Sequence, residues 1–320
     1  MSKGKLLLLA ILPVLAYFGA KAYLHYRVGE AVDSAIEQMA PFTEISYSGI
    51  SSSWEGSVAV NGLIFSLPAF GEEIEVGAIA LQTPGFFYLL DFKEKMSKGE
   101  FPDTLTLSVE DLEVRLHSEW MRTVEARAAA QAAAESIPVP CFESQVQQMN
   151  TYRPLGYGSL LMDFSMGYTL DRDDGQIALE FSQTVQDAYD VKGSLNLKAG
   201  SVPVSALMMG GYRPVLKSAR LTLEDLSYTE RLISYCVEKT GLSRDQAVDA
   251  QAEYFSQVLT KFGIVPDAPI MNEYKKFLDQ PEILRVSAEP PRPVDLSRLD
   301  LYKAEDIPNL LNVNIHALER

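Results

Sequence analysis

The strongest constraint on the fold is the strict alternation of side chains along residues 159–170. A period of two is typical of a β-strand whose two faces meet different surroundings. Asp173-Asp174-Gly175 predicts a tight hairpin turn directly after this strand. The apolar members of the alternation are Leu160, Met162, Phe164, Met166, Tyr168 and Leu170. Ile177, Leu179 and Phe181 continue it on the return strand.

Four side chains of this strand form a candidate apolar ligand face: Met162, Phe164, Met166 and Tyr168. Methionine side chains are flexible and polarizable, which suits adaptable apolar binding. An ordinary hydrophobic core produces the same alternation, so the pattern by itself leaves both interpretations open.

The N-terminus begins with two lysines around a glycine and continues as an unbroken apolar run from Leu6 to Ala20. With Lys21 reaching outward to the head groups, Leu6 to Leu24 is long enough to cross a bilayer. Helical spacing continues to about Ala40, which favours a retained signal-anchor with a helical neck over a removable signal peptide. Ala20-Lys21-Ala22 nevertheless fits a cleavage site, so removal stays open. The positive start predicts an inner-membrane protein with a cytoplasmic N-terminus and a periplasmic body.

The charge of the chain is unevenly distributed. Its formal net charge is −15, and residues 1–28 hold four basic residues and no acidic one, so residues 29–320 carry −19. Phosphate binding depends on clustered lysine and arginine, so the sequence predicts no nucleic-acid partner.

Further strands are predicted at 57–67, 73–81, 105–116, 191–197, 283–288 and 310–315, and helices at 86–96, 120–136, 229–239, 243–262 and 272–278. A phase slip near Asp111 predicts a bulge, and Asn61-Gly62 predicts a bulge or a turn. Gly77–Leu81 matches Gly193–Leu197 at an offset of 116, as does Leu105–Leu107 with Leu221–Leu223. The fold class is therefore α+β: a transmembrane helix, then a duplicated, mainly antiparallel sheet with helices packed on one side.

The predicted division has four parts. Residues 1–40 form the anchor and neck, 41–150 the first repeat with its helical tail, 151–265 the second repeat, and 266–320 a C-terminal extension that packs on the body. Cys141 follows the first tail and Cys236 lies in the second. In an exported protein this pair suggests one disulfide, the alternative being two separate buried thiols.

Motifs of common enzymes are not found in the sequence. His25, His117 and His316 have no Cys, Asp or Glu at metal-ligand spacing. Asp171-Arg-Asp-Asp-Gly175 resembles a calcium loop only in part, since Ser182 stands where the twelfth ligand belongs. The sequence therefore predicts a protein that is no enzyme and has no metal and no cofactor.

The segment from residue 6 to 67 resembles the start of the AsmA/TamB-like envelope proteins of Gram-negative bacteria. The resemblance consists of the membrane helix, the helical neck and the strand pattern Gly56-Ser-Val-Ala-Val-Asn-Gly62. The whole chain also resembles an uncharacterised membrane-anchored family of such bacteria. The AsmA-like group implies an apolar β-groove and a role in lipid movement or envelope upkeep. The expected function is to hold a lipid or other apolar ligand in a curved sheet; the alternative is a scaffold that binds an envelope protein partner.

Overall fold

The computed structural model describes residues 3–132, 141, 152–198, 215–261 and 263–320. Side chains are described throughout these ranges except at 3–17, 128–132 and 300. The chain forms two compact units, residues 1–111 and 112–320. The predicted four-part division is drawn along different lines and stays a prediction.

The first unit begins with the long helix α1 (Lys3–Met39) and continues into a small antiparallel sheet. Strand β3 is its centre and pairs with β1, β2 and β4. The bounds are β1 (Glu44–Ser46), β2 (Gly49–Ser52), β3 (Ser57–Leu67), β4 (Glu72–Gln82), α2 (Phe86–Leu90), α3 (Phe92–Ser97) and β5 (Thr104–Arg115), which leads into the second unit. The buried residues Leu24, Val58, Phe86 and Leu89 form the core between α1, β3 and α2.

Two predicted irregularities of these strands have a backbone counterpart. Gly62 has φ 58° within β3, which continues past it, so Asn61-Gly62 is not a turn. Asp111 has φ 52° within β5, at the place of the predicted phase slip. A left-handed residue inside a strand is typical of a bulge.

The N-terminal helix was predicted to span a membrane. Across the residues whose side chains are described, no helix is both long enough and apolar enough to do so. Most of the predicted span, Leu6 to Leu24, falls on residues 3–17, whose side chains lie outside the described part.

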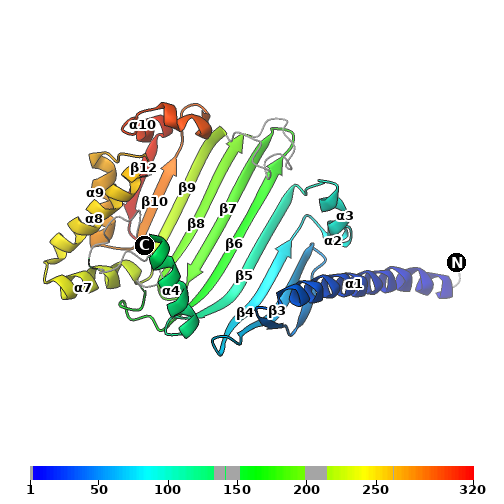
Figure 1. Cartoon of the computed structure of the whole chain (residues 1–320). Coiled ribbons are helices and arrows are strands. Elements are labelled where there is room, and N and C mark those ends of the chain that lie inside the picture. The colour runs from blue at the N-terminus through cyan, green and yellow to red at the C-terminus, as the bar shows by residue number, and fades with distance from the viewer. Residues whose placement is uncertain (1–2, 133–140, 142–151, 199–214, 262) are drawn as a thin grey trace. The chain divides into compact units, whose positions relative to one another are not determined.

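The second unit contains an open antiparallel sheet with the strand order β6-β7-β8-β9-β10-β12, and β11 pairs with β9 (Figure 1). Its strands are β6 (Ser159–Asp171), β7 (Gln176–Val185), β8 (Tyr189–Lys198), β9 (Val215–Asp225), β10 (Ile283–Ala288), β11 (Val294–Asp295) and β12 (Val313–Leu318). Its helices are α4 (Glu119–Ala132), α7 (Tyr228–Thr240), α8 (Arg244–Lys261), α9 (Ala268–Asp279), the 3-10 helix η1 (Leu296–Leu301) and α10 (Ile307–Leu311). The α+β class and the antiparallel pairing are as predicted.

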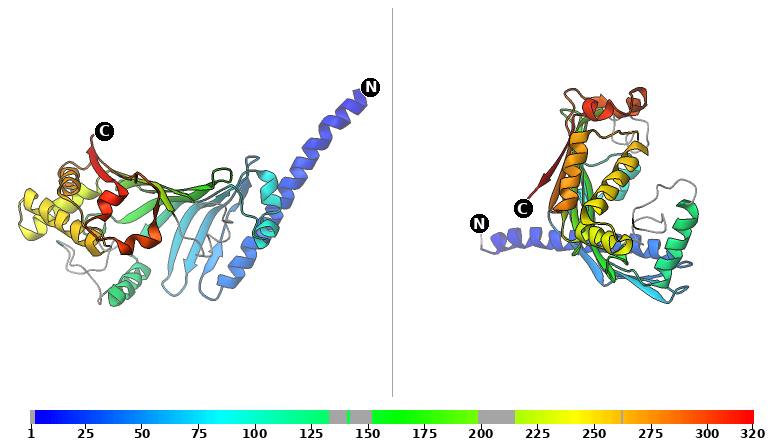
Figure 2. Two further views of the ribbon diagram at one scale, coloured as in Figure 1. Left: turned by 90° about the horizontal axis from the view of Figure 1, so that it is seen from above. Right: turned by 90° about the vertical axis from the view of Figure 1, so that its left-hand side faces the viewer.

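Helices α7, α8 and α9 lie on one side of this sheet (Figure 2). Most of their apolar side chains pack on β9, β10 and β12. The buried members of this core are Ile233, Cys236, Ala247, Val248, Ala252, Ile270, Phe277, Leu278, Leu284 and Ile315. Tyr228, Leu232 and Tyr235 of α7 also pack against the cluster that contains Leu160 at the start of β6 and Val185 at the end of β7. The helical cover is therefore partial.

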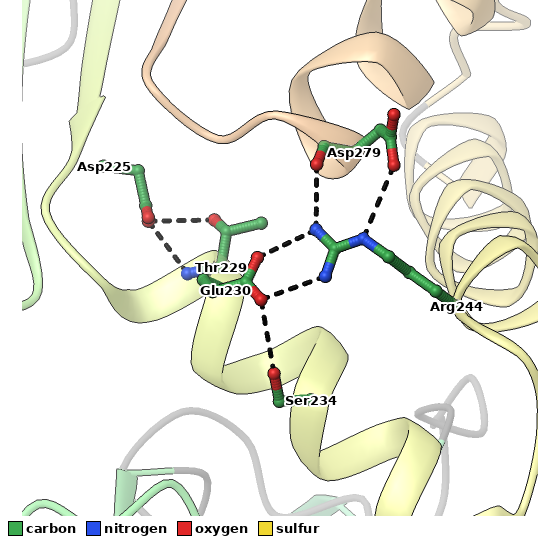
Figure 3. Close-up of polar contacts among 6 residues, drawn as sticks. All are labelled: Asp225, Thr229, Glu230, Ser234, Arg244 and Asp279. Atoms are coloured by element: carbon green, nitrogen blue, oxygen red, sulfur yellow. Dashed lines mark hydrogen bonds and ion pairs between the residues drawn. The ribbon is translucent and has the colours of Figure 1, made fainter.

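The N-termini of α7 and α8 are fixed by charged side chains (Figure 3). The carboxylate of Asp225 accepts hydrogen bonds from the backbone N–H and the hydroxyl of Thr229, both at 2.9 Å. Arg244 donates to both carboxylate oxygens of Glu230, at 2.9 and 2.8 Å, and to the carbonyl of Asp279 at 2.8 Å. The hydrogen bonds from Arg244 lower the pKa of the Glu230 carboxyl. Asp225 and Glu230 thus have structural roles at the start of α7.

Two further sequence predictions have definite outcomes. Ser243-Arg-Asp-Gln246 predicts a capping box at the start of α8. It is confirmed, because Ser243 N–H donates to Gln246 Oε1 at 2.9 Å and Gln246 N–H donates to Ser243 Oγ at 3.3 Å. The strand predicted at 310–315 is wrong in its first part. Pro308 lies in the first turn of α10, and Asn312 ends that helix with φ 48°, so the strand begins at Val313. The sequence also predicts a short helix at Met208-Met209 in the second repeat, and this segment lies within 199–214, outside the described residues.

The structure joins Cys141 and Cys236 by a disulfide, with the two Cα atoms 5.1 Å apart. Cys236 lies on the buried face of α7 and is fully buried. The side-chain amide of Gln251 on α8 donates to Cys236 Sγ at 3.3 Å. The structure therefore contains the disulfide and not two separate buried thiols.

Candidate functional site: the apolar face of the second unit's sheet

The register of the sheet places the alternating apolar side chains of β6, β7 and β8 on one face. Met166 lies opposite Phe181, and Tyr168 lies opposite Leu179. Leu179 in turn lies opposite Leu195 on β8. We call this surface the apolar face and define it by Phe164, Met166, Tyr168, Leu179, Phe181, Val191 and Leu195. The opposite face of the same strands is mostly polar and includes Ser165, Thr169, Glu180, Ser182, Lys192 and Ser194.

Much of the apolar face is open to solvent. Met166 is 54% exposed, Phe181 42%, and Phe164 and Leu179 38% each. The helices α7–α9 contact the sheet mainly at β9, β10 and β12, α7 also packs on the start of β6 and the end of β7, and α10 and η1 pack over the far ends of β8 and β9. Large contiguous apolar surfaces of this kind mark interaction or ligand sites in soluble proteins. The face is therefore a candidate binding surface and not a closed core.

Gly193 on β8 shapes the middle of this face. It lies directly opposite Phe181 in the register. A Cβ atom at Gly193 would come within 2.1 Å of the Phe181 ring, so a larger side chain would displace the ring. Glycine here lets Phe181 lie across the neighbouring strand, which gives the face a flat aromatic floor.

At one end the face leads into a hollow of about 390 Å³, near the start of β6 and the end of β7. This volume falls within the size range of small-molecule sites. The lining residues are Tyr152, Leu160, Met162, Gln183, Tyr189, Val191, Leu223 and Tyr228. None of them carries a formal charge.

The tyrosines of the hollow pack against one another. The hydroxyls of Tyr152 and Tyr189 are hydrogen-bonded at 2.9 Å, and the Tyr228 ring lies 5.4 Å from that of Tyr152 and 5.9 Å from that of Tyr189. Burial raises the pKa of both Tyr152 and Tyr228. Their hydroxyls therefore stay protonated, and so remain hydrogen-bond donors, at any physiological pH.

Two polar groups of the hollow are left for a ligand. Within the described part of the chain, neither the Gln183 side-chain amide nor the Tyr228 hydroxyl has a hydrogen-bond partner. Both side chains are partly buried and line a concave site, so their polar groups are available to the polar atoms of a ligand.

The structure brings the four predicted residues together on one face of β6: Met162 in the hollow, and Phe164, Met166 and Tyr168 beyond it. Their role in binding stays a prediction. The sequence prediction missed Gln183, Tyr152, Tyr189 and Tyr228, which come from separate segments. Among the residues that the structure describes, no three His, Cys, Asp or Glu side chains are grouped so as to hold a metal ion.

A protein-family model matches residues 156–318, the segment from just before β6 to β12. That segment contains the apolar face, all but one residue of the hollow's lining, and α7–α9. The family is described as "Uncharacterized protein". The chain belongs to this family. No curated protein matches the sequence.

Proposed function

We propose that this protein is a non-catalytic envelope protein, anchored in the inner membrane by α1, that binds a lipid or another apolar ligand on its apolar face. The observation that carries the proposal is the exposure of four large apolar side chains on β6 and β7, beyond the part of these strands on which α7 packs. They are Met166, Phe181, Phe164 and Leu179. Each methylene group that an acyl chain buries there contributes about 0.8 kcal/mol. The concave site and the flat floor over Gly193 both suit an elongated apolar molecule.

The proposed fold includes a duplication. The order hairpin, strand, helix occurs as β3-β4, β5, α4 and again as β7-β8, β9, α7. Cys141 follows α4, and its bridge leads to α7, so the disulfide joins the ends of the two corresponding runs. This repetition supports the repeat read from the sequence. The resemblance of residues 6–67 to AsmA/TamB-like proteins is part of the same proposal.

An aromatic platform in the first unit supports the membrane location. Trp54 stacks on Phe86 at 5.4 Å and meets the edge of Phe87 at 5.8 Å. Trp54 is 54% exposed and Phe87 68%. Phe86 packs on Leu24 of α1, at the end of the predicted span. Tryptophan and other aromatic side chains favour the head-group level of a bilayer, which is where this platform would lie.

The platform is held rigidly by its backbone. Gly56 has φ 94°, and a Cβ atom there would lie 2.6 Å from the backbone of Gly85. Thr83 donates to the Gly56 carbonyl from both its N–H, at 2.9 Å, and its hydroxyl, at 3.0 Å. The turn that carries Trp54 is therefore fixed against the segment that leads into α2, and the exposed ring is held in place.

We expect Trp54 to lie in the head-group region when the full chain is reconstituted into vesicles. The chain has two tryptophans, so Trp120→Phe leaves Trp54 as the single reporter. Lipids brominated near the glycerol should quench its fluorescence more strongly than lipids brominated deep in the acyl chain. The reverse variant, Trp54→Phe, reports Trp120 and should be quenched weakly by both. Equal quenching of the two variants would contradict the location of Trp54 in the head-group region.

For the ligand, we expect a phospholipid with a diazirine in its acyl chain to label β6, β7 or β8 when the full chain is illuminated with it in mild detergent. Mapping the labelled peptides separates this site from lipid held around α1. Met166→Glu should lower labelling of these strands by about tenfold or more, because it places a carboxylate against the acyl chain. Thr169→Glu adds the same charge on the polar face of the same strand and should change little.

The scaffold alternative predicts a different result of the same experiment. If the apolar face binds a protein partner, illumination in membrane extracts should join β6–β8 to another protein, and purified lipid should not label them. Labelling confined to α1 and its surroundings would remove the support for a lipid on the sheet.

A further inference from the structure

The hollow and the apolar face differ in chemistry although they are continuous. Beyond the hollow the face presents only carbon and sulfur side chains and Tyr168. Inside the hollow, Gln183 and Tyr228 add two polar groups without partners among the described residues. An elongated ligand would therefore meet polar groups at one end only.

Two charged side chains near the hollow, those of Asp225 and Arg231, already have partners. Asp225 lies opposite Tyr189 on β9, but both hydrogen bonds from Thr229 go to one of its carboxylate oxygens. Arg231 lies 4.5 Å over the Tyr157 ring and donates to the Leu155 carbonyl at 3.3 Å. Neither charge belongs to the lining. A ligand that brought a charge of either sign would have no counter-charge in the hollow.

We propose that the hollow binds the uncharged polar end of the ligand, an ester carbonyl at the end of an acyl chain, in preference to an ionised carboxylate or an ammonium group. This inference rests on the proposed function. The Gln183 side-chain NH₂ and the Tyr228 hydroxyl donate to the carbonyl oxygen, and the chain lies along Phe164, Met166 and Phe181.

Desolvation accounts for the selectivity. A neutral carbonyl is paired by two donors at little cost, whereas an ionised carboxylate would lose its water without gaining a cation. The size of the hollow agrees with this assignment. One water molecule takes up about 30 Å³ in the liquid, so a hollow of about 390 Å³ has room for an ester group and the first part of its acyl chain.

The test is a competition experiment with the full chain in mild detergent. Four C16 competitors share one chain and differ in their end: methyl palmitate, palmitate, hexadecyltrimethylammonium and hexadecane. Each is added before illumination of the diazirine phospholipid, and the label on β6–β8 is measured. Methyl palmitate should displace the label at about tenfold lower concentration than any of the others, the value of a well-made buried hydrogen bond.

The variants Gln183→Leu and Tyr228→Phe remove the donors and keep the shape of the side chains. In both variants, methyl palmitate should displace the label only at the concentration that hexadecane requires. The concentration required for hexadecane should not change. Gln257→Leu makes the same change on the exposed side of α8 and should keep the preference. The paired readout separates a lost hydrogen bond from a general loss of folding.

The two proposals fail in different ways. No labelling of β6–β8 and no displacement by any competitor would overturn the proposed function. Labelling that palmitate or the ammonium compound displaces best, or that all four displace equally, would keep the apolar face as a lipid site and overturn the assignment of its polar end.

Discussion

Phe277→Ala should lower the free energy of unfolding of the second unit by about 3–5 kcal/mol, the usual cost of removing a buried phenylalanine. Phe277 is 2% exposed and lies on α9, in the core that this helix forms with α7, α8, β10 and β12. Its ring lies 6.4 Å from that of Tyr274. Because elements packed on every side hold the cavity open, the neighbours cannot collapse to fill it.

Urea unfolding of the full chain in mild detergent measures this loss. Trp120 belongs to the second unit, so the measurement uses a Trp54→Phe background, in which Trp120 is the only tryptophan. Phe181→Ala makes the same change on the apolar face, where the ring is 42% exposed, and should cost less than about 1 kcal/mol. A similar cost at both positions would show that the apolar face behaves as core, which would weaken the ligand proposal.

The comparison of these two phenylalanines also shows how far sequence alone could lead. Periodicity identifies which side chains of a strand share a face, and it did so for Met162 to Tyr168. It cannot tell a covered face from an open one, because both have the same alternation. That difference depends on where α7, α8 and α9 pack. Most of their apolar side chains pack on strands later in the chain, and α7 reaches β6 and β7 only at the end where the hollow lies.

Local signals were reliable where a few neighbouring residues determine the structure. The capping box at Ser243 and Gln246 begins α8, and the turn after Asp171 holds because its carboxylate accepts from the N–H groups of Asp173 and Asp174. Asp267 caps α9 and Pro269 follows in its first turn, which starts the helix before the predicted residue 272. The polar end of the site had no such signal, since Tyr152, Gln183 and Tyr228 lie far apart in the sequence. They come together only because α7 and the segment before β6 pack against the sheet.

Removal of the disulfide is the second large effect that we expect. The double variant Cys141→Ala/Cys236→Ala should lose about 4 kcal/mol of stability, because the bridge closes a loop with a sequence separation of 95 and so restricts the unfolded chain. Wild type unfolded in the presence of a reductant should lose a similar amount. The double variant itself should be indifferent to the reductant, which makes it the control for effects of the reagent.

Cys141→Ala alone separates the two contributions of the bridge. It removes the cross-link but keeps the Cys236 sulfur in the core, where the Gln251 amide contacts it. We expect most of the loss already in this single variant, and the further step to Cys236→Ala should add about 1 kcal/mol or less for the missing sulfur atom. A stability that does not respond to reductant in wild type would contradict the bridge.

The loss of stability on removing the disulfide bears on the cellular compartment that we propose for the protein. Disulfides persist in oxidising compartments such as the periplasm and are kept reduced in the cytosol. With a total stability of about 5–15 kcal/mol for a typical domain, a loss of about 4 kcal/mol leaves little margin for the second unit in a reducing environment. A strong dependence on the bridge would therefore favour export of the second unit, and with it the access to membrane lipid that the proposed ligand requires. A weak dependence would leave the apolar face as a binding surface but remove this argument for its place in the envelope.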